Sequence, residues 1–87
     1  MNNRIVYHVT WNSGEFQWEV KRSGEEKTLF YISGDSDQPK ERAIAKAISF
    51  ARNDLAEGRL SQIKVHNKKG RFQFERTYGN DPRESEG

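Results

Sequence analysis

The feature that most constrains this chain is a hairpin pattern in its second half, over Leu60–Tyr78. Apolar residues alternate with polar ones on both sides of the turn sequence Asn67-Lys68-Lys69-Gly70. Such alternation is typical of half-buried strands, and a short polar turn ending in glycine is typical of a β-hairpin. The apolar members of the two runs are Ile63, Val65, Phe72, Phe74 and Tyr78. The sequence therefore predicts one antiparallel pair of strands here.

Two runs near the start of the chain alternate in the same way and predict two further strands. The first run is Arg4–Trp11, and the turn cluster Asn12-Ser13-Gly14 separates it from the second. Apolar positions of the second run are Phe16, Trp18 and Val20. A short apolar run at Thr28–Ile32 predicts a third strand, which we expect at an edge of the sheet.

The segment from Gly34 to Pro39 predicts the end of the strand region and the start of a helix. Ser36 or Asp37 can cap this helix, and Pro39 is compatible only with its first turn. Small and branched apolar residues then recur at steps of three and four: Ala43, Ile44, Ala47, Ile48, Ala51 and Leu55. This spacing predicts one apolar stripe on a helix of about five turns. Gly58 fits the left-handed residue just beyond its end.

The predicted order is β-β-(β)-α-β-β, and the fold class is α+β. We expect an antiparallel sheet of four to five strands with one helix packed on one face, because strands joined by short turns run antiparallel. Only the connection through the helix allows a parallel crossover. Eighty-seven residues suffice for one domain. We place a single compact domain at residues 1–82 and a frayed polar tail at residues 83–87.

Composition excludes several classes of protein. Only 32% of the residues are apolar and the mean hydropathy is −1.08, so the core is thin. The absence of cysteine excludes disulfides, thiolate catalysis and zinc-thiolate sites. No apolar run approaches the roughly 20 residues that span a bilayer, and the segment Met1–Arg4 does not begin a signal peptide. We therefore expect a cytoplasmic protein without membrane contact.

Several short motifs occur in a characteristic order along nearly the whole chain. They are Tyr7-His8-Val9, Trp18-Glu19-Val20, Gly24, Ala43, Ala47, Ala51, Val65-His66, Gly70 and Tyr78-Gly79-Asn80-Asp81-Pro82. In these motifs the chain resembles the Domain of Unknown Function 2188 family of small bacterial and phage-type proteins. The resemblance implies a compact β-β-α-β-β type domain and no assigned activity. The stretch Glu25–Gln38 is longer than the link into the helix in that family.

The chemically reactive side chains give no catalytic set. His8 and His66, the only histidines, lie on the polar sides of their strands. If the first and fourth strands are neighbours, the two imidazoles can approach each other near Glu19 or Glu75 and hold a metal ion. The alternative, two solvated histidines, is favoured because no third ligand has a fixed spacing. We expect no enzyme activity, cofactor, metal or small-molecule ligand.

The predicted hairpin carries the one local charge imbalance of the chain. Residues 59–76 contain six basic residues and one acid, a local charge of +5, whereas the whole chain carries +2. Candidate contacts to nucleic-acid phosphates, or to another acidic partner, are Arg59, Lys64, Lys68, Lys69 and Arg71. The alternative is a solvated edge on which lysines prevent aggregation.

The width of the predicted sheet suggests an uncovered apolar surface. Five strands at about 4.8 Å spacing make a sheet of roughly 24 Å, whereas one helix is about 10 Å across. Seven aromatic residues take the apolar sides of their strands, which favours a core over a base-stacking platform. They are Tyr7, Trp11, Phe16, Trp18, Phe72, Phe74 and Tyr78. The aromatic residues that we expect the helix to leave uncovered, as an apolar interface, are Trp11, Phe16, Phe72 and Phe74. We expect a non-enzymatic interaction domain that contacts a protein partner or a second copy of itself, with nucleic-acid binding as the alternative.

Overall fold

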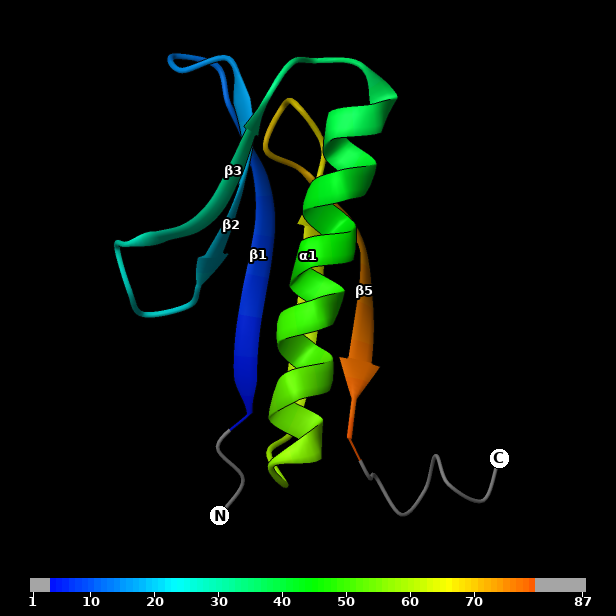
Figure 1. The fold of residues 1–87 in the computed structure, drawn as a ribbon. Helices are drawn as coiled ribbons and strands as arrows, with labels where there is room; N and C mark the ends of the chain where they lie inside the picture. Colours follow the sequence, from blue (N-terminus) through cyan, green and yellow to red (C-terminus); the bar gives the residue numbers. More distant parts are fainter. Residues whose placement is uncertain (1–3, 80–87) are drawn as a thin grey trace.

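The computed structural model describes residues 4–79, and in this range the chain forms five strands and one helix. The elements are β1 (Ile5–Asn12), β2 (Gln17–Arg22), β3 (Thr28–Ser33), α1 (Asp37–Ala56), β4 (Ser61–His66) and β5 (Phe72–Tyr78). Figure 1 shows α1 lying across one face of the sheet. The α+β class is thus confirmed. The tail predicted at residues 83–87 and the boundary at residue 82 lie outside the described residues.

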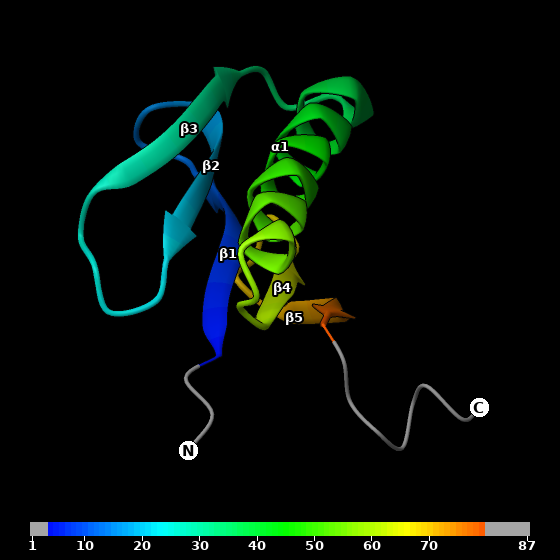
Figure 2. The ribbon, with the colours of Figure 1, turned by 60° about the horizontal axis from the view of Figure 1, so that its bottom comes forward.

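The strands form one sheet of order β3-β2-β1-β4-β5. The pairs β1–β2, β2–β3 and β4–β5 are antiparallel, and β3 is an edge strand as predicted. However, β1 and β4 run parallel, so the prediction of an antiparallel sheet is wrong. The reason lies in the connection: α1 returns the chain along the sheet, and β4 then starts beside the start of β1. Figure 2 shows the five strands with α1 above them.

Three alanines of α1 lie against the sheet. Ala43, Ala47 and Ala51 are fully buried over core side chains of β1, β2 and β4, and their small size brings the helix close to the strands. The predicted stripe is wrong at its end, because Leu55 is 43% exposed and Asp54 is buried instead. Each step of four residues turns the stripe by about 40°, so position 54 returns toward the sheet and position 55 turns away.

Two glycines are required by the backbone around the helix and the last strand. Gly58 follows α1 with φ of +84°, the left-handed residue that the sequence predicts. Gly79 has φ of +135°, and a Cβ at this position would clash with the side chain of Leu60. Glycine therefore lets the end of β5 pass the segment that enters β4.

A β-bulge changes the orientation of the first residue of β5. Val65 pairs with Phe74, but the next residue, His66, pairs with Phe72, so Gln73 is an extra residue in β5. Phe72 consequently lies beside His66 on the face away from α1, which we call the open face. Phe74 stays on the face that carries α1, the helix face. The prediction that both phenylalanines share a face is wrong, because the simple alternation of side chains does not hold across a bulge.

The single helix covers the sheet unevenly. It packs most closely against β2, β3 and β4 and least against β5. In Figure 2 the β3 side of the sheet rises beside α1, whereas β5 lies at the far edge. None of the seven residues of β5 is buried, and its first five residues are exposed. Within residues 4–79 no helix is both long and apolar enough to cross a membrane.

Candidate interaction surface

The strand β5 presents an uncovered edge with two exposed aromatic side chains. It pairs only with β4, so its outer side has no neighbouring strand in the described part of the chain. Phe72 is 55% exposed on the open face and Phe74 is 39% exposed on the helix face. An edge of this kind can accept a further strand through its free N–H and C=O groups. We call the residues of β5 the β5 edge.

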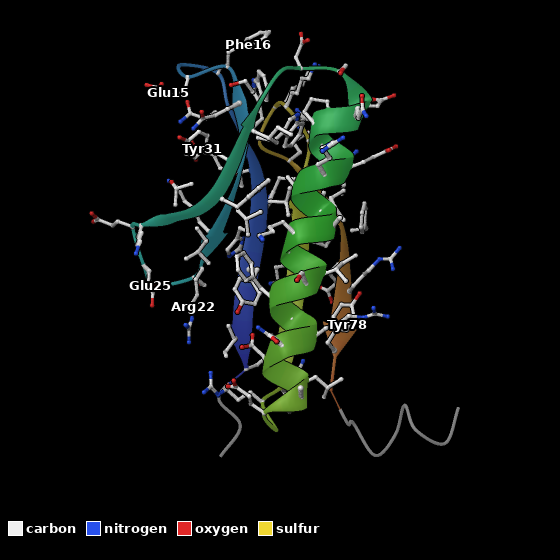
Figure 3. The ribbon with its side chains drawn as sticks, in the orientation of Figure 1. Glu15, Phe16, Arg22, Glu25, Tyr31 and Tyr78 are labelled. Atoms are coloured by element: carbon white, nitrogen blue, oxygen red, sulfur yellow. The ribbon has the colours of Figure 1, made fainter. Side chains whose placement is uncertain are left out.

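The other two predicted interface residues, Trp11 and Phe16, lie elsewhere. Their rings meet edge to face at 5.3 Å between centroids, and Trp11 also packs on Trp18 at 5.5 Å. Phe16 is 52% exposed because it belongs to the turn between β1 and β2, where its φ is +57° (Figure 3). The four predicted residues therefore form two separate pairs, and only Phe72 and Phe74 lie on the edge strand.

Three of the predicted basic residues gather at the tip of the last hairpin. The Asn67 side-chain oxygen accepts hydrogen bonds from the backbone N–H groups of Lys69 and Arg71, each at 2.9 Å, and fixes the turn. Lys68 has its ammonium nitrogen 3.7 Å from a carboxylate oxygen of Asp35. It also lies over the ring of Trp11. Lys69 and Arg71 are exposed and form no ion pair with any described residue.

The remaining two basic residues do not extend this group. Arg59 precedes β4, whereas the tip follows it, so the two lie at opposite ends of that strand. Its guanidinium forms ion pairs with Glu57 at 2.9 Å and Asp54 at 3.8 Å. Lys64 lies in the middle of β4, next to His8 in the register of the sheet. The five residues therefore do not form one basic stripe.

The two histidines meet on the open face, because the parallel pairing places β1 beside β4. Nδ1 of His8 lies 3.2 Å from Nε2 of His66, and the rings share a hydrogen bond. The edge of Phe72 packs on His66, with 6.1 Å between ring centroids. Burial lowers the pKa of His8, and the neighbouring His66 and Lys64 lower it further. The sequence predicted that the two imidazoles approach each other if the first and fourth strands are neighbours. The strands are neighbours, and the imidazoles do approach each other.

Glu19 is the carboxylate most shielded from solvent on the open face, at 4% exposure. It accepts hydrogen bonds from Asn12 at 2.8 Å and Gln17 at 2.7 Å. Burial alone raises the pKa of Glu19, but these bonds and the nearby Lys21 outweigh it, so the pKa lies below its usual value. Among residues 4–79 no third histidine, cysteine or carboxylate joins His8 and His66.

The sequence did not predict the buried polar cluster that Asp54 of α1 forms with Tyr7 and Ser61. Oδ2 of Asp54 accepts hydrogen bonds from the Tyr7 hydroxyl at 2.6 Å and the Ser61 hydroxyl at 2.8 Å. Burial, followed by the hydrogen bond to Asp54, raises the pKa of Tyr7 to about 12. Ser61 is completely buried, and no pocket opens anywhere in the described part of the chain. The cluster therefore joins the end of α1 to β1 and β4 rather than presenting a nucleophile.

Comparison of the chain with protein-family models, with curated proteins and with solved structures gives no match. The resemblance to the Domain of Unknown Function 2188 family therefore stays a prediction. Three features of the structure suggest a function. They are the exposed strand β5, the basic hairpin tip and the histidine pair.

Proposed function

We propose that this chain is a non-enzymatic interaction domain, and that a second copy of the chain binds it by pairing along the β5 edge. The observation that carries the proposal is the incomplete cover of the sheet: five of the seven residues of β5 are exposed, whereas four of the six residues of the other edge strand, β3, are half-buried. Strand pairing would satisfy the free backbone groups of this edge and cover Phe72 and Phe74 from one side.

The size of the exposed apolar surface favours weak association. An aromatic side chain presents about 200 Å² of surface, so even complete burial of Phe72 and Phe74 in both copies would give at most on the order of 8 kcal/mol. Lost translational and rotational freedom costs at least about 4 kcal/mol of this gain. The remainder, at most about 4 kcal/mol, corresponds to a dissociation constant of about 1 mM or weaker from apolar burial alone.

The composition of the strand supports a second copy as the partner. The segment Phe72–Tyr78 carries one acid, Glu75, and one base, Arg76, so it is neutral as a whole. Two antiparallel copies of it meet about a twofold axis without net charge repulsion, and the same surface is used by both. The basic tip, in contrast, would repel its own copy.

Sedimentation velocity from low micromolar to millimolar concentration tests the proposal. We expect the sedimentation coefficient to rise with concentration toward the value of a dimer, twice the 10.2 kDa chain. The variant Phe74→Glu should stay monomeric, since it places two carboxylates at the interface. Tyr31→Glu is the matched control, because Tyr31 is 63% exposed on the opposite edge strand. Wild-type protein that is monomeric throughout, or equal behaviour of the two variants, refutes the self-association.

Nucleic-acid binding is a second candidate, and the exposed tip favours it. Lys69 and Arg71 extend from the turn, and Phe72 follows them on the open face. Cations beside an exposed ring are the combination that binds single strands. Fluorescence anisotropy with a labelled single strand at low and moderate salt tests this candidate, because phosphate contacts weaken steeply with salt. The double variant Lys69→Glu/Arg71→Glu should lose the binding, and no binding by wild type at low salt refutes the candidate.

A further inference from the structure

The histidine pair on the open face is held by two directly paired strands, β1 and β4. His8 lies in the middle of β1 and His66 at the end of β4, and the two strands are paired over five residue positions. The ring centroids are 5.4 Å apart with an interplanar angle of 31°. Both side chains are partly buried, and Phe72 packs against His66. The two imidazoles therefore meet without a prior change of the backbone.

We propose that His8 and His66 chelate one divalent transition-metal ion, through Nδ1 of His8 and Nε2 of His66. The chemical class is an imidazole-preferring ion, and Zn²⁺ is the representative that fits the geometry. Two nitrogens 3.2 Å apart can both bond to one ion at about 2.1 Å when the angle at the ion is about 100°, near the tetrahedral value. The separation is thus already that of a bidentate site.

The hydrogen bond between the rings is what the ion replaces. In the metal-free protein one ring donates its N–H to the other across 3.2 Å. With a metal bound, each neutral ring carries its proton on the other nitrogen, Nε2 of His8 and Nδ1 of His66, so only the tautomer of the donating ring changes. Much of the cost of ordering the side chains is met in the metal-free fold, which favours binding.

The surroundings set the strength of the site. Because no third histidine, cysteine or carboxylate of residues 4–79 joins the pair, water completes the coordination. Two imidazoles and water bind more weakly than a closed four-ligand site, so we expect a micromolar dissociation constant. Lys64, beside His8 in the sheet register, opposes a cation and weakens the site. Mg²⁺ and Ca²⁺ prefer oxygen ligands and should not compete.

Isothermal titration of the full chain with Zn²⁺ tests the site, with Mg²⁺ as the control ion. We expect saturable binding of one ion per chain in the micromolar range, and no binding of Mg²⁺. His8→Gln and His66→Gln should each weaken Zn²⁺ binding at least about tenfold, because each removes one of two bonds. Lys64→Gln should strengthen it by about two- to fivefold, because it removes a repelling charge. This opposite sign distinguishes a metal site from a general loss of structure.

Circular dichroism shows whether each variant is folded before its titration. Imidazole resonances of the wild type, followed during the Zn²⁺ titration, should shift for both histidines together. Absence of Zn²⁺ binding up to about 1 mM overturns the proposal, since a bidentate imidazole site binds far below that concentration. Wild-type affinity in both folded histidine variants also overturns it, because the ion would then bind elsewhere on the chain.

Discussion

The two edge strands of the sheet, β3 and β5, have equivalent positions but are covered to different degrees. Each pairs with a single neighbour in the sheet. On β3 the apolar side chains Phe30 and Ile32 pack against the core, and the Lys46 ammonium of α1 lies 5.8 Å from the centroid of Phe30. On β5 the aromatic side chains Phe72 and Phe74 are exposed. Tyr31 of β3 is exposed as well, but four of the six residues of β3 are half-buried, whereas five of the seven residues of β5 are exposed. The β3 edge is therefore better covered than the β5 edge.

The difference between the edges follows from the order of the elements along the chain. The helix directly follows β3, so a short connection keeps its start beside that edge. It then crosses toward the start of β4, and β5 is added beyond the strand at which the helix ends. A single helix placed by these connections cannot also cover β5. The exposed edge thus results from topology as much as from its own residues.

The largest expected effect lies on the covered side. Ala47→Asp places an unpaired carboxylate at a fully buried position under α1, at a cost of several kcal/mol. A domain of this size has on the order of 5 kcal/mol of stability, so the variant should be largely unfolded. Ala45→Asp is the matched control, because Ala45 lies on the exposed side of the same helix. Thermal melts that agree for both variants would show that the covered face is not the core.

The buried cluster below the helix should make stability depend on alkaline pH. The pKa of Tyr7 is about 12 in the folded protein and 10.0 in the unfolded chain, so the unfolded chain loses its proton first. Stability is therefore full below pH 10 and falls as the pH rises toward 12, by at most about 3 kcal/mol. Urea unfolding at pH 9 and 11 measures the loss. Tyr7→Phe should have a smaller loss over this range, and an equal loss in both proteins contradicts the assignment.

The same substitution on the two edge strands should have unequal costs. Phe30→Ala removes a ring that packs on the core and should cost about 2 kcal/mol of unfolding free energy. Phe74→Ala removes a ring that is 39% exposed and should cost less than Phe30→Ala in the monomer. Urea unfolding at low protein concentration gives both values. Equal costs would mean that β5 is as well packed as β3.

The smallest effect is expected at the hairpin tip. Replacing Lys68, Lys69 and Arg71 with Glu takes the net charge from +2 to −4. Exposed charges contribute about 0.5 kcal/mol each or less, so the melting temperature should change little. The pair between Lys68 and Asp35 is also exposed and adds little. A large loss of stability would show that the tip holds the fold together rather than being free to bind.

Patterns within a few residues predicted the strands and the helix of this fold. They did not predict which strands far apart in the sequence pair with each other. The alternating runs, the helix and Gly58 follow from spacing and backbone preference, which act over a few residues. The parallel pairing of β1 with β4 depends on where a helical connection delivers the chain, which no local pattern encodes. Asp54 was missed because a carboxylate in a helix is expected in solvent, and only its partners Tyr7 and Ser61 explain its burial.

The candidate surface was predicted only in part, because it too depends on how distant parts of the chain pack together. Sheet width indicated that some aromatic side chains stay exposed, and Phe72 and Phe74 are among them. Which edge is uncovered depends on the path of α1, so Trp11 could not be separated from them by sequence. The bulge that turns Phe72 to the open face arises from the pairing of β5 with β4 and has no signature in either strand alone.

Amide hydrogen exchange at low and high protein concentration tests whether a second copy pairs along β5, because it reports on both edge strands in one experiment. If the β5 edge pairs with a second copy, protection along Phe72–Tyr78 rises with concentration, while protection along Thr28–Ser33 does not change. Phe74→Glu should remove the concentration dependence and leave the β3 values as they are. Protection of β5 that is independent of concentration in the wild type, or a rise confined to β3, would contradict the account.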